Sequence, residues 1–119
     1  MMKNQILGAS GEEAVMKYVE AKGFTVLDRN WRIKSGEIDL IARTPRGVMT
    51  FIEVKSRSSR SFGDPLEAIN PEKALRLQKL ALAWLVLHGM WGSEYRIDCA
   101  GVIFARDGRC EIDYREGVL

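Results

Sequence analysis

The sequence predicts an α/β protein in which a mixed central β-sheet is flanked by helices. The chain has 119 residues, which is the length of one domain, and we treat residues 1–119 as a single unit. Hydrophobic residues make up 46% of the sequence, enough to build a core. The apolar patterns follow the order helix, three strands, helix, two strands. That order is typical of a sheet covered by helices.

The first helix is expected over residues 10–22. Ser10 and Glu13 have the spacing of a capping box, and Gly23 is a suitable residue to end the helix. Apolar residues recur at helical spacing between them, at Val15, Met16 and Val19.

The remaining elements are apolar runs separated by turn residues. Strands are expected over residues 24–27, 37–43, 48–55, 96–105 and 110–114. Residues 44–47 form a turn, so the second and third strands make a β-hairpin. The second helix begins after Asn70, with Pro71 at its first position, and ends near His88.

Composition limits the classes of function. The net charge of +2 and the pI of about 8.6 are compatible with a nucleic-acid partner without requiring one. Cys99, Cys110 and the single histidine His88 do not have the spacing of a zinc site, and we expect two free thiols in a reducing cytoplasm. The sequence shows no signal peptide and no apolar run long enough to span a membrane. We therefore expect a soluble cytoplasmic protein without a membrane partner.

Two carboxylates and a lysine lie on the predicted hairpin. Asp39 should point away from Ile38 and Leu40, because neighbouring residues in a strand face opposite sides. On the next strand Glu53 and Lys55 share a face. Pairing across the hairpin can bring Asp39 beside Glu53, so these three groups are candidate catalytic residues.

A divalent cation would neutralise such a pair of acids. Mg²⁺ binds carboxylates, waters and phosphate oxygens, activates water and polarises phosphorus, while Lys55 would stabilise the charge of the transition state. The alternative is a surface ion-pair ladder across the hairpin. The Glu-x-Lys pattern alone does not decide between them, since Glu20 and Lys22 repeat it at a helix end.

Two further charged residues lie on the inward faces of the predicted helices. Glu12 aligns with Val15 and Val19, which makes it a third candidate catalytic acid; the alternative is a partner for the helix dipole. Lys73 aligns with Leu77 at the start of the second helix, where a bound phosphate would explain a cation; the alternative is a lysine that extends past the edge of the core.

Basic residues flank the hairpin acids in two stretches. They suit a track along a nucleic-acid backbone, although such runs are also common in solvated loops. We select Arg32, Arg57, Arg60 and Lys73 as nucleic-acid-binding candidates. Trp31 and Phe62 could stack on bases or pack against the sheet. Asp98 could orient a cation near the site or pair with a neighbour, and Glu37 shares a face with Asp39.

The sequence resembles a known family in several blocks. The most specific are GEIDLIA at residues 36–42 and FIEVKSR at residues 51–57, joined by Gly11-Glu12 and Arg29-Asn30-Trp31-Arg32. These blocks resemble the YraN-type uncharacterised bacterial family, which belongs with the PD-(D/E)XK nuclease superfamily and is distantly similar to archaeal Holliday-junction resolvases. Ile38 stands where the superfamily motif has proline.

The resemblance implies a restriction-endonuclease-like core and a site for Mg²⁺ or Mn²⁺. Its metal ligands would be Asp39, Glu53 and the Val54 carbonyl, with Lys55 beside them and Glu12 as an additional acid. It also implies DNA as the partner, with branched or structured DNA as one form, and resolvases suggest a homodimer by analogy. Two hypotheses follow: a metal-dependent endonuclease, and a non-catalytic nucleic-acid-binding module that keeps the fold.

Overall fold

The computed structural model describes residues 2–57 and 69–119, with side chains from residue 10 onward. Two helices and five strands follow one another in the predicted order within these residues. They are α1 Met2–Ala21, β1 Thr25–Ile33, β2 Gly36–Arg43, β3 Met49–Arg57, α2 Pro71–Leu87, β4 Tyr95–Phe104 and β5 Cys110–Arg115. The predicted α/β class is confirmed.

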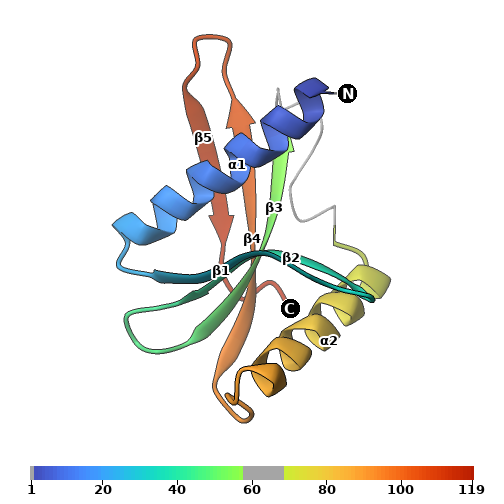
Figure 1. The fold of residues 1–119 in the computed structure, drawn as a ribbon. Coiled ribbons are helices and arrows are strands. Elements are labelled where there is room, and N and C mark those ends of the chain that lie inside the picture. The colour runs from blue at the N-terminus through green and yellow to red at the C-terminus, as the bar shows by residue number, and fades with distance from the viewer. Residues whose placement is uncertain (1, 58–68) are drawn as a thin grey trace.

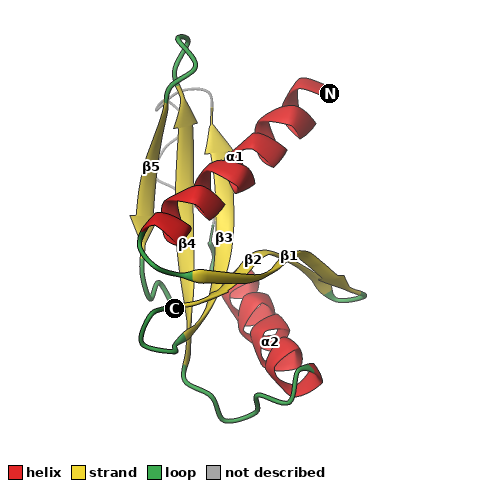
Figure 2. Ribbon diagram, turned by 60° about the vertical axis from the view of Figure 1, so that its left-hand side comes forward, coloured by secondary structure: helices red, strands yellow, loops and turns green. Residues whose placement is uncertain are grey.

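The strands form one sheet in the order β1-β2-β3-β4-β5. β3 and β4 run parallel because α2 connects them, while the other neighbours are antiparallel. In Figure 1, α1 runs diagonally across one face of β3, β4 and β5, and α2 packs beside the β1–β2 hairpin. Figure 2 shows that hairpin crossing the direction of β3–β5, so the sheet is strongly twisted.

The core is divided between the two faces of the sheet. On the α2 side, Phe51 makes edge contacts with Trp84 and Tyr95 at ring distances of 5.8 and 6.0 Å. On the α1 side, the fully buried Val15 and Val19 of the helix pack against Leu40, Ile52, Ala100 and Val102 of the sheet. Each helix therefore packs against one face of the β2–β3 hairpin, which carries the predicted acids Asp39 and Glu53.

Both helices end as the sequence indicates, but one of them starts elsewhere. Asn70 caps α2 by accepting a hydrogen bond from the amide of Lys73 at 2.8 Å. Gly23, with φ of +90°, ends α1, and the amide of Phe24 donates to the carbonyl of Val19. The predicted start at Ser10 is wrong, because the helix begins at Met2 and Ser10 lies inside it. Residues 2–9 contain no proline to stop the helix.

The strand expected over residues 24–27 is longer in the structure and continues to Ile33. In the described sheet β1 is an edge strand that pairs only with β2, and its polar residues remain accessible to solvent. That exposure hides the strand from a pattern search that looks for apolar residues. The strand expected over residues 48–55 also continues further, since β3 includes residues 56 and 57.

Candidate metal centre at the fork between β2 and β3

The candidate site lies where β2 and β3 separate. Their antiparallel ladder runs from Arg43↔Met49 to Leu40↔Ile52 and ends there. Beyond this point, among the described strands, β2 pairs only with β1 and β3 pairs only with β4. Asp39 and Glu53, which would form the next pair, are therefore at the opening of a fork.

The bend of β2 at the fork changes which side its residues face. Leu40 packs in the α1-side core, as the alternation predicts, but Ile38 packs in the α2-side core with Ile41. The expectation that Ile38 and Leu40 share the face opposite Asp39 is therefore wrong. Strict alternation requires a regular strand, and β2 loses regular pairing with β3 at this residue.

Asp39 is held at the fork by the backbone of β3. The amide of Val54 donates a hydrogen bond to Oδ2 of Asp39 at 2.8 Å. Burial, followed by the negative charge of Glu53, raises the pKa of Asp39 to about 7, although the Val54 hydrogen bond opposes the shift. Glu12 and Glu37 raise the same pKa further. Asp39 is therefore an acid whose charge is unfavourable without a cation nearby.

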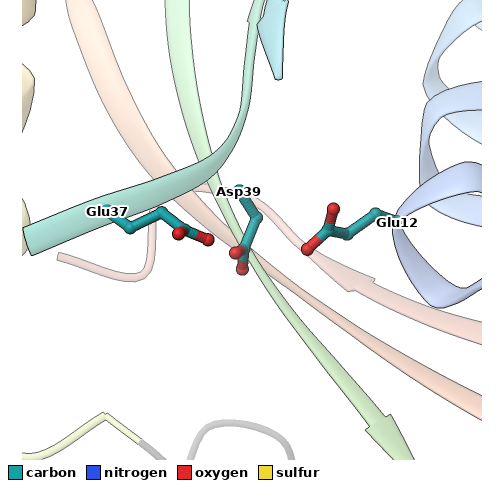
Figure 3. A group of neighbouring side chains, drawn as sticks. All are labelled: Glu12, Glu37 and Asp39. Atoms are coloured by element: carbon teal, nitrogen blue, oxygen red, sulfur yellow. The ribbon is translucent and has the colours of Figure 1, made fainter. Parts of the chain in front are cut away.

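Three carboxylates meet around Asp39. One carboxylate oxygen from each of Glu12, Glu37 and Asp39 lies within 4.8 Å of the others, an arrangement that could hold a metal ion. Figure 3 shows Glu12 reaching in from α1 and Glu37 from β2, with Asp39 between them. The structure therefore brings Glu12 and Asp39, two of the acids selected from the sequence, together with Glu37.

Glu12 is positioned by close packing of α1 on β3. A Cβ added to the preceding Gly11 would lie 1.9 Å from Oγ of Ser56 and 3.2 Å from its Cβ. Burial raises the pKa of Glu12, while a hydrogen bond with the side chain of Asn30 lowers it. Asn30 is the only described non-glycine residue with positive φ, at 50°. Sequence reasoning gave Asn30 no role beyond its place in a family block.

Glu53 lies on the other side of the fork and has a cation of its own. Nζ of Lys73 is 3.3 Å from Oε1 of Glu53, and their side chains are only 23% and 12% exposed. Glu53 is outside the group of three acids, although its charge acts on Asp39. A cavity of about 250 Å³ joins the two sides. Its walls include Gly36, Glu37, Asp39, Glu53, Lys73, Arg76, Leu77 and Leu80.

Lys55 is half-buried two residues beyond Glu53 on β3. The alternation of the strand places it on the same side as Glu53, since Val54 packs in the α1-side core. Within the described part of the chain Lys55 forms no ion pair, so its ammonium has no carboxylate to neutralise it there.

The basic stretch before the hairpin is largely neutralised. Arg29 forms an ion pair with Glu13 at 3.2 Å, and Arg32 hydrogen-bonds to Oε2 of Glu37. Arg57 lies at the end of β3 and has further contacts. Arg60 and Phe62 fall outside the described residues.

The other residues selected from the sequence pack against, or hydrogen-bond to, neighbouring parts of the fold. Trp31 packs against the α2-side core. Asp98 is fully buried and accepts hydrogen bonds from Arg96, Tyr114 and the amide of Gly117, which attach the C-terminal segment to β4. His88 stacks on Trp84 at a ring distance of 4.0 Å. Both cysteines are free thiols. Neither described helix is long and apolar enough to cross a membrane.

A family model places the chain among known sequences. The model of the uncharacterised protein family UPF0102 matches residues 11–102. The chain belongs to this family. A UPF0102 protein of Leifsonia xyli subsp. xyli is 43% identical over 119 residues and covers 100% of both chains. Another, from Beutenbergia cavernae, is 41% identical over 118 residues and covers 99% of both. The YraN-type resemblance is confirmed.

Two solved structures overlap the UPF0102 chain in part. A structure of an EndoMS–dsDNA2 complex has a TM-score of 0.36 and 23% identity, over 62% of this chain and 26% of the other. Pyrococcus furiosus SfsA in complex with Ca²⁺ has a TM-score of 0.43 and 17% identity, over 95% of this chain and 63% of the other. This chain therefore spans less than two thirds of either protein, and neither supplies it with a function.

Proposed function

We propose that this UPF0102 protein is a metal-dependent endonuclease that hydrolyses phosphodiester bonds in DNA, with branched or structured DNA among its substrates. The observation that carries the proposal is the position of Asp39. Its carboxylate is fixed by the Val54 amide within a group of three acids, in a setting that raises its pKa to about 7. Like charges held this close are costly unless a cation neutralises them.

The donor set suits Mg²⁺ or Mn²⁺, because hard divalent cations prefer carboxylate and carbonyl oxygens. When bound, such a cation would act as a Lewis acid and lower the pKa of a coordinated water. Asp39 is common to both ligand sets that the site offers. One set adds Glu53 and the Val54 carbonyl, and the other adds Glu12 and Glu37.

The Val54 carbonyl suits the first set. In an extended strand the N–H and C=O of one residue point to the same edge. Since the Val54 amide points toward Asp39, its carbonyl is directed to the β2 side of β3 as well. Measuring metal affinity distinguishes the two ligand sets. If Glu53→Gln loses metal affinity and Glu37→Gln does not, the metal binds the first set, and the reverse result selects the second set.

Lys55 would supply the fixed cation for catalysis. Its ammonium is on the Glu53 side of β3 and has no acidic partner within the described residues, so it is available to a phosphate group. A cation fixed beside a phosphate that gains charge in the transition state lowers the barrier without reorganising. Lys55 would then contribute more to the rate of cleavage than to binding.

Cleavage of linear, flapped and four-way DNA with Mn²⁺ tests the proposal. Wild type should cleave at least one of these substrates. Lys55→Ala should keep metal and DNA binding but cleave roughly 10²–10³-fold more slowly. Absence of cleavage by wild type on every substrate would favour the non-catalytic binding module. Equal cleavage by wild type, Lys55→Ala and Asp39→Ala would indicate a contaminating nuclease and overturn the proposal.

A further inference from the structure

The basic residues of α2 form a cleft that continues from the candidate metal centre. Arg76 lines the cavity that contains Asp39 and Glu53, and it also lines a second cavity of about 310 Å³. The second cavity is bounded by Ser35 of the β1–β2 turn and by Glu72, Leu75, Arg76 and Lys79 of α2. We call this second cavity the α2 cleft. It opens beside the acids, between the turn and the helix.

The walls of the α2 cleft are fixed closely together. Gly36, at the turn, has φ of +152°, a conformation that favours glycine. A Cβ at this residue would lie 3.0 Å from Cδ1 of Leu80 and 3.5 Å from Cδ of Arg76. The turn therefore rests on the buried side of α2 and on the aliphatic part of Arg76. This contact directs the cleft along the exposed side of the helix.

The cations of the cleft are not neutralised by the other described residues. Arg76 and Lys79 are exposed, and neither forms an ion pair with the described residues. Arg29 and Arg32, by contrast, are paired with Glu13 and Glu37. Among the described residues Glu72 is the one acid lining the cleft, so this lining has an excess of positive charge.

We infer that the α2 cleft binds the DNA backbone beside the cleaved bond, with Arg76 and Lys79 contacting successive phosphates. The inference rests on the proposed nuclease function and specifies where its substrate lies. Lys73, Arg76 and Lys79 are spaced by three residues. The three residues from Arg76 to Lys79 rise about 4.5 Å along the helix, comparable with one nucleotide at about 3.4 Å of axial rise. A polyanion beside four carboxylates needs such cations to remain bound.

The binding test uses the double variant Arg76→Gln/Lys79→Gln and a control that removes a positive charge elsewhere. Arg106→Gln removes a charge from the β4–β5 turn, which lies at the opposite end of the molecule from α2 in both views. With Asp39→Asn in all proteins to prevent cleavage, affinity for a flapped duplex is measured against salt. Two lost phosphate contacts should lower the salt slope by about 1.8, whereas Arg106→Gln should leave it unchanged. Glu72→Gln should tighten binding.

A cleavage test locates the contacts on the substrate. Single phosphates on each side of the cleaved bond are replaced by neutral methylphosphonates. Wild type should lose activity when phosphates on one side are neutralised, and the double variant should be insensitive to those same replacements. If wild type cleaves but the double variant retains its pattern and its salt slope, the inference is wrong and the nuclease proposal stands. If wild type neither binds nor cleaves DNA, the proposed function itself fails.

Discussion

The amide of Val54 donates a hydrogen bond to Asp39 at the residue where β2 stops pairing with β3. A side chain thus takes over a backbone donor that regular pairing would have satisfied. The same bond fixes the Asp39 carboxylate beside Glu12 and Glu37. The acidic site therefore lies at the point where the two strands separate, and one hydrogen bond contributes to both features.

The raised pKa of Asp39 predicts how stability depends on pH without metal. The pKa is about 7 in the folded chain against 3.8 for a free side chain, so the folded state holds a proton that the unfolded state releases. Stability should fall as pH rises from about 4 to 7. Asp39→Asn removes this loss and keeps an acceptor for Val54. The free energy of unfolding of Asp39→Asn should exceed that of wild type by roughly 1–3 kcal/mol at pH 8, and the difference should be much smaller at pH 5.

Chemical denaturation with a chelator present measures this difference. Asp107→Asn neutralises an acid paired with Arg109 at the surface and serves as the control. A constant gap between Asp39→Asn and wild type from pH 5 to pH 8 would show that the Asp39 charge is not unfavourable in the folded chain.

The ion pair between Lys73 and Glu53 predicts competition between lysine and metal. Lys73→Met leaves the Glu53 carboxylate, whose side chain is 12% exposed, without its cation. The free energy of unfolding of the metal-free protein should therefore fall by roughly 1–2 kcal/mol. If Glu53 is a ligand, the same variant should bind Mn²⁺ more tightly, because the competing charge is gone. Calorimetry gives both values. Lys79→Met removes an unpaired cation from the same helix and controls for net charge, and weaker Mn²⁺ binding by Lys73→Met alone would contradict the competition.

Because the backbone of Asn30 is in the left-handed region, substitutions at this residue should separate effects on metal binding from effects on stability. Asn30→Gly tolerates φ of 50° but removes the amide that reaches Glu12, so Mn²⁺ affinity should fall with little change in melting temperature. Asn30→Ala removes the amide and adds strain of roughly 1–2 kcal/mol. Parallel melting and metal titration of both variants distinguish the effects. Unchanged affinity in both would mean that Asn30 does not position Glu12.

The close approach of Gly11 to Ser56 predicts that a substitution of Ser56 rescues a substitution of Gly11. Alanine normally favours a helix over glycine by about 1 kcal/mol, but Gly11→Ala should destabilise this protein and weaken Mn²⁺ binding by moving α1 and Glu12. Ser56→Ala should be nearly neutral, because its buried Oγ has no hydrogen-bond partner among the described residues. The double variant should recover much of the loss. Additive effects in this double-mutant cycle would show that the two residues do not clash.

Local signals in the sequence predicted much of the fold. Asn70 and Pro71 set the start of α2, and the turn at residues 44–47 set the hairpin. These features depend on a few neighbouring residues, so patterns along the chain reveal them. Hairpin pairing also predicts Asp39 opposite Glu53, but the ladder ends one pair earlier, at Leu40↔Ile52, and Glu53 lies outside the group of three acids.

Features that depend on the bend of β2 could not be predicted in this way. Ile38 turns to the α2-side core only because β2 leaves β3 at Asp39, and no alternation pattern contains that information. Alternation puts Glu37 on the face of Asp39, but its approach to Glu12 depends on how α1 packs against β3. Arg76 and Lys79 did leave a signal, since they continue the three-residue spacing of Lys73, but their pairing state became known only from the structure.

Titration of Mn²⁺ into wild type and Asp39→Ala tests the central claim most directly. Calorimetry should show binding to wild type that tightens as pH rises through about 7, where Asp39 loses its proton, and that is lost in Asp39→Ala. The metal should also raise the melting temperature of wild type alone. Equal Mn²⁺ binding by both proteins, or no binding by wild type, would contradict a metal centre at the β2–β3 fork.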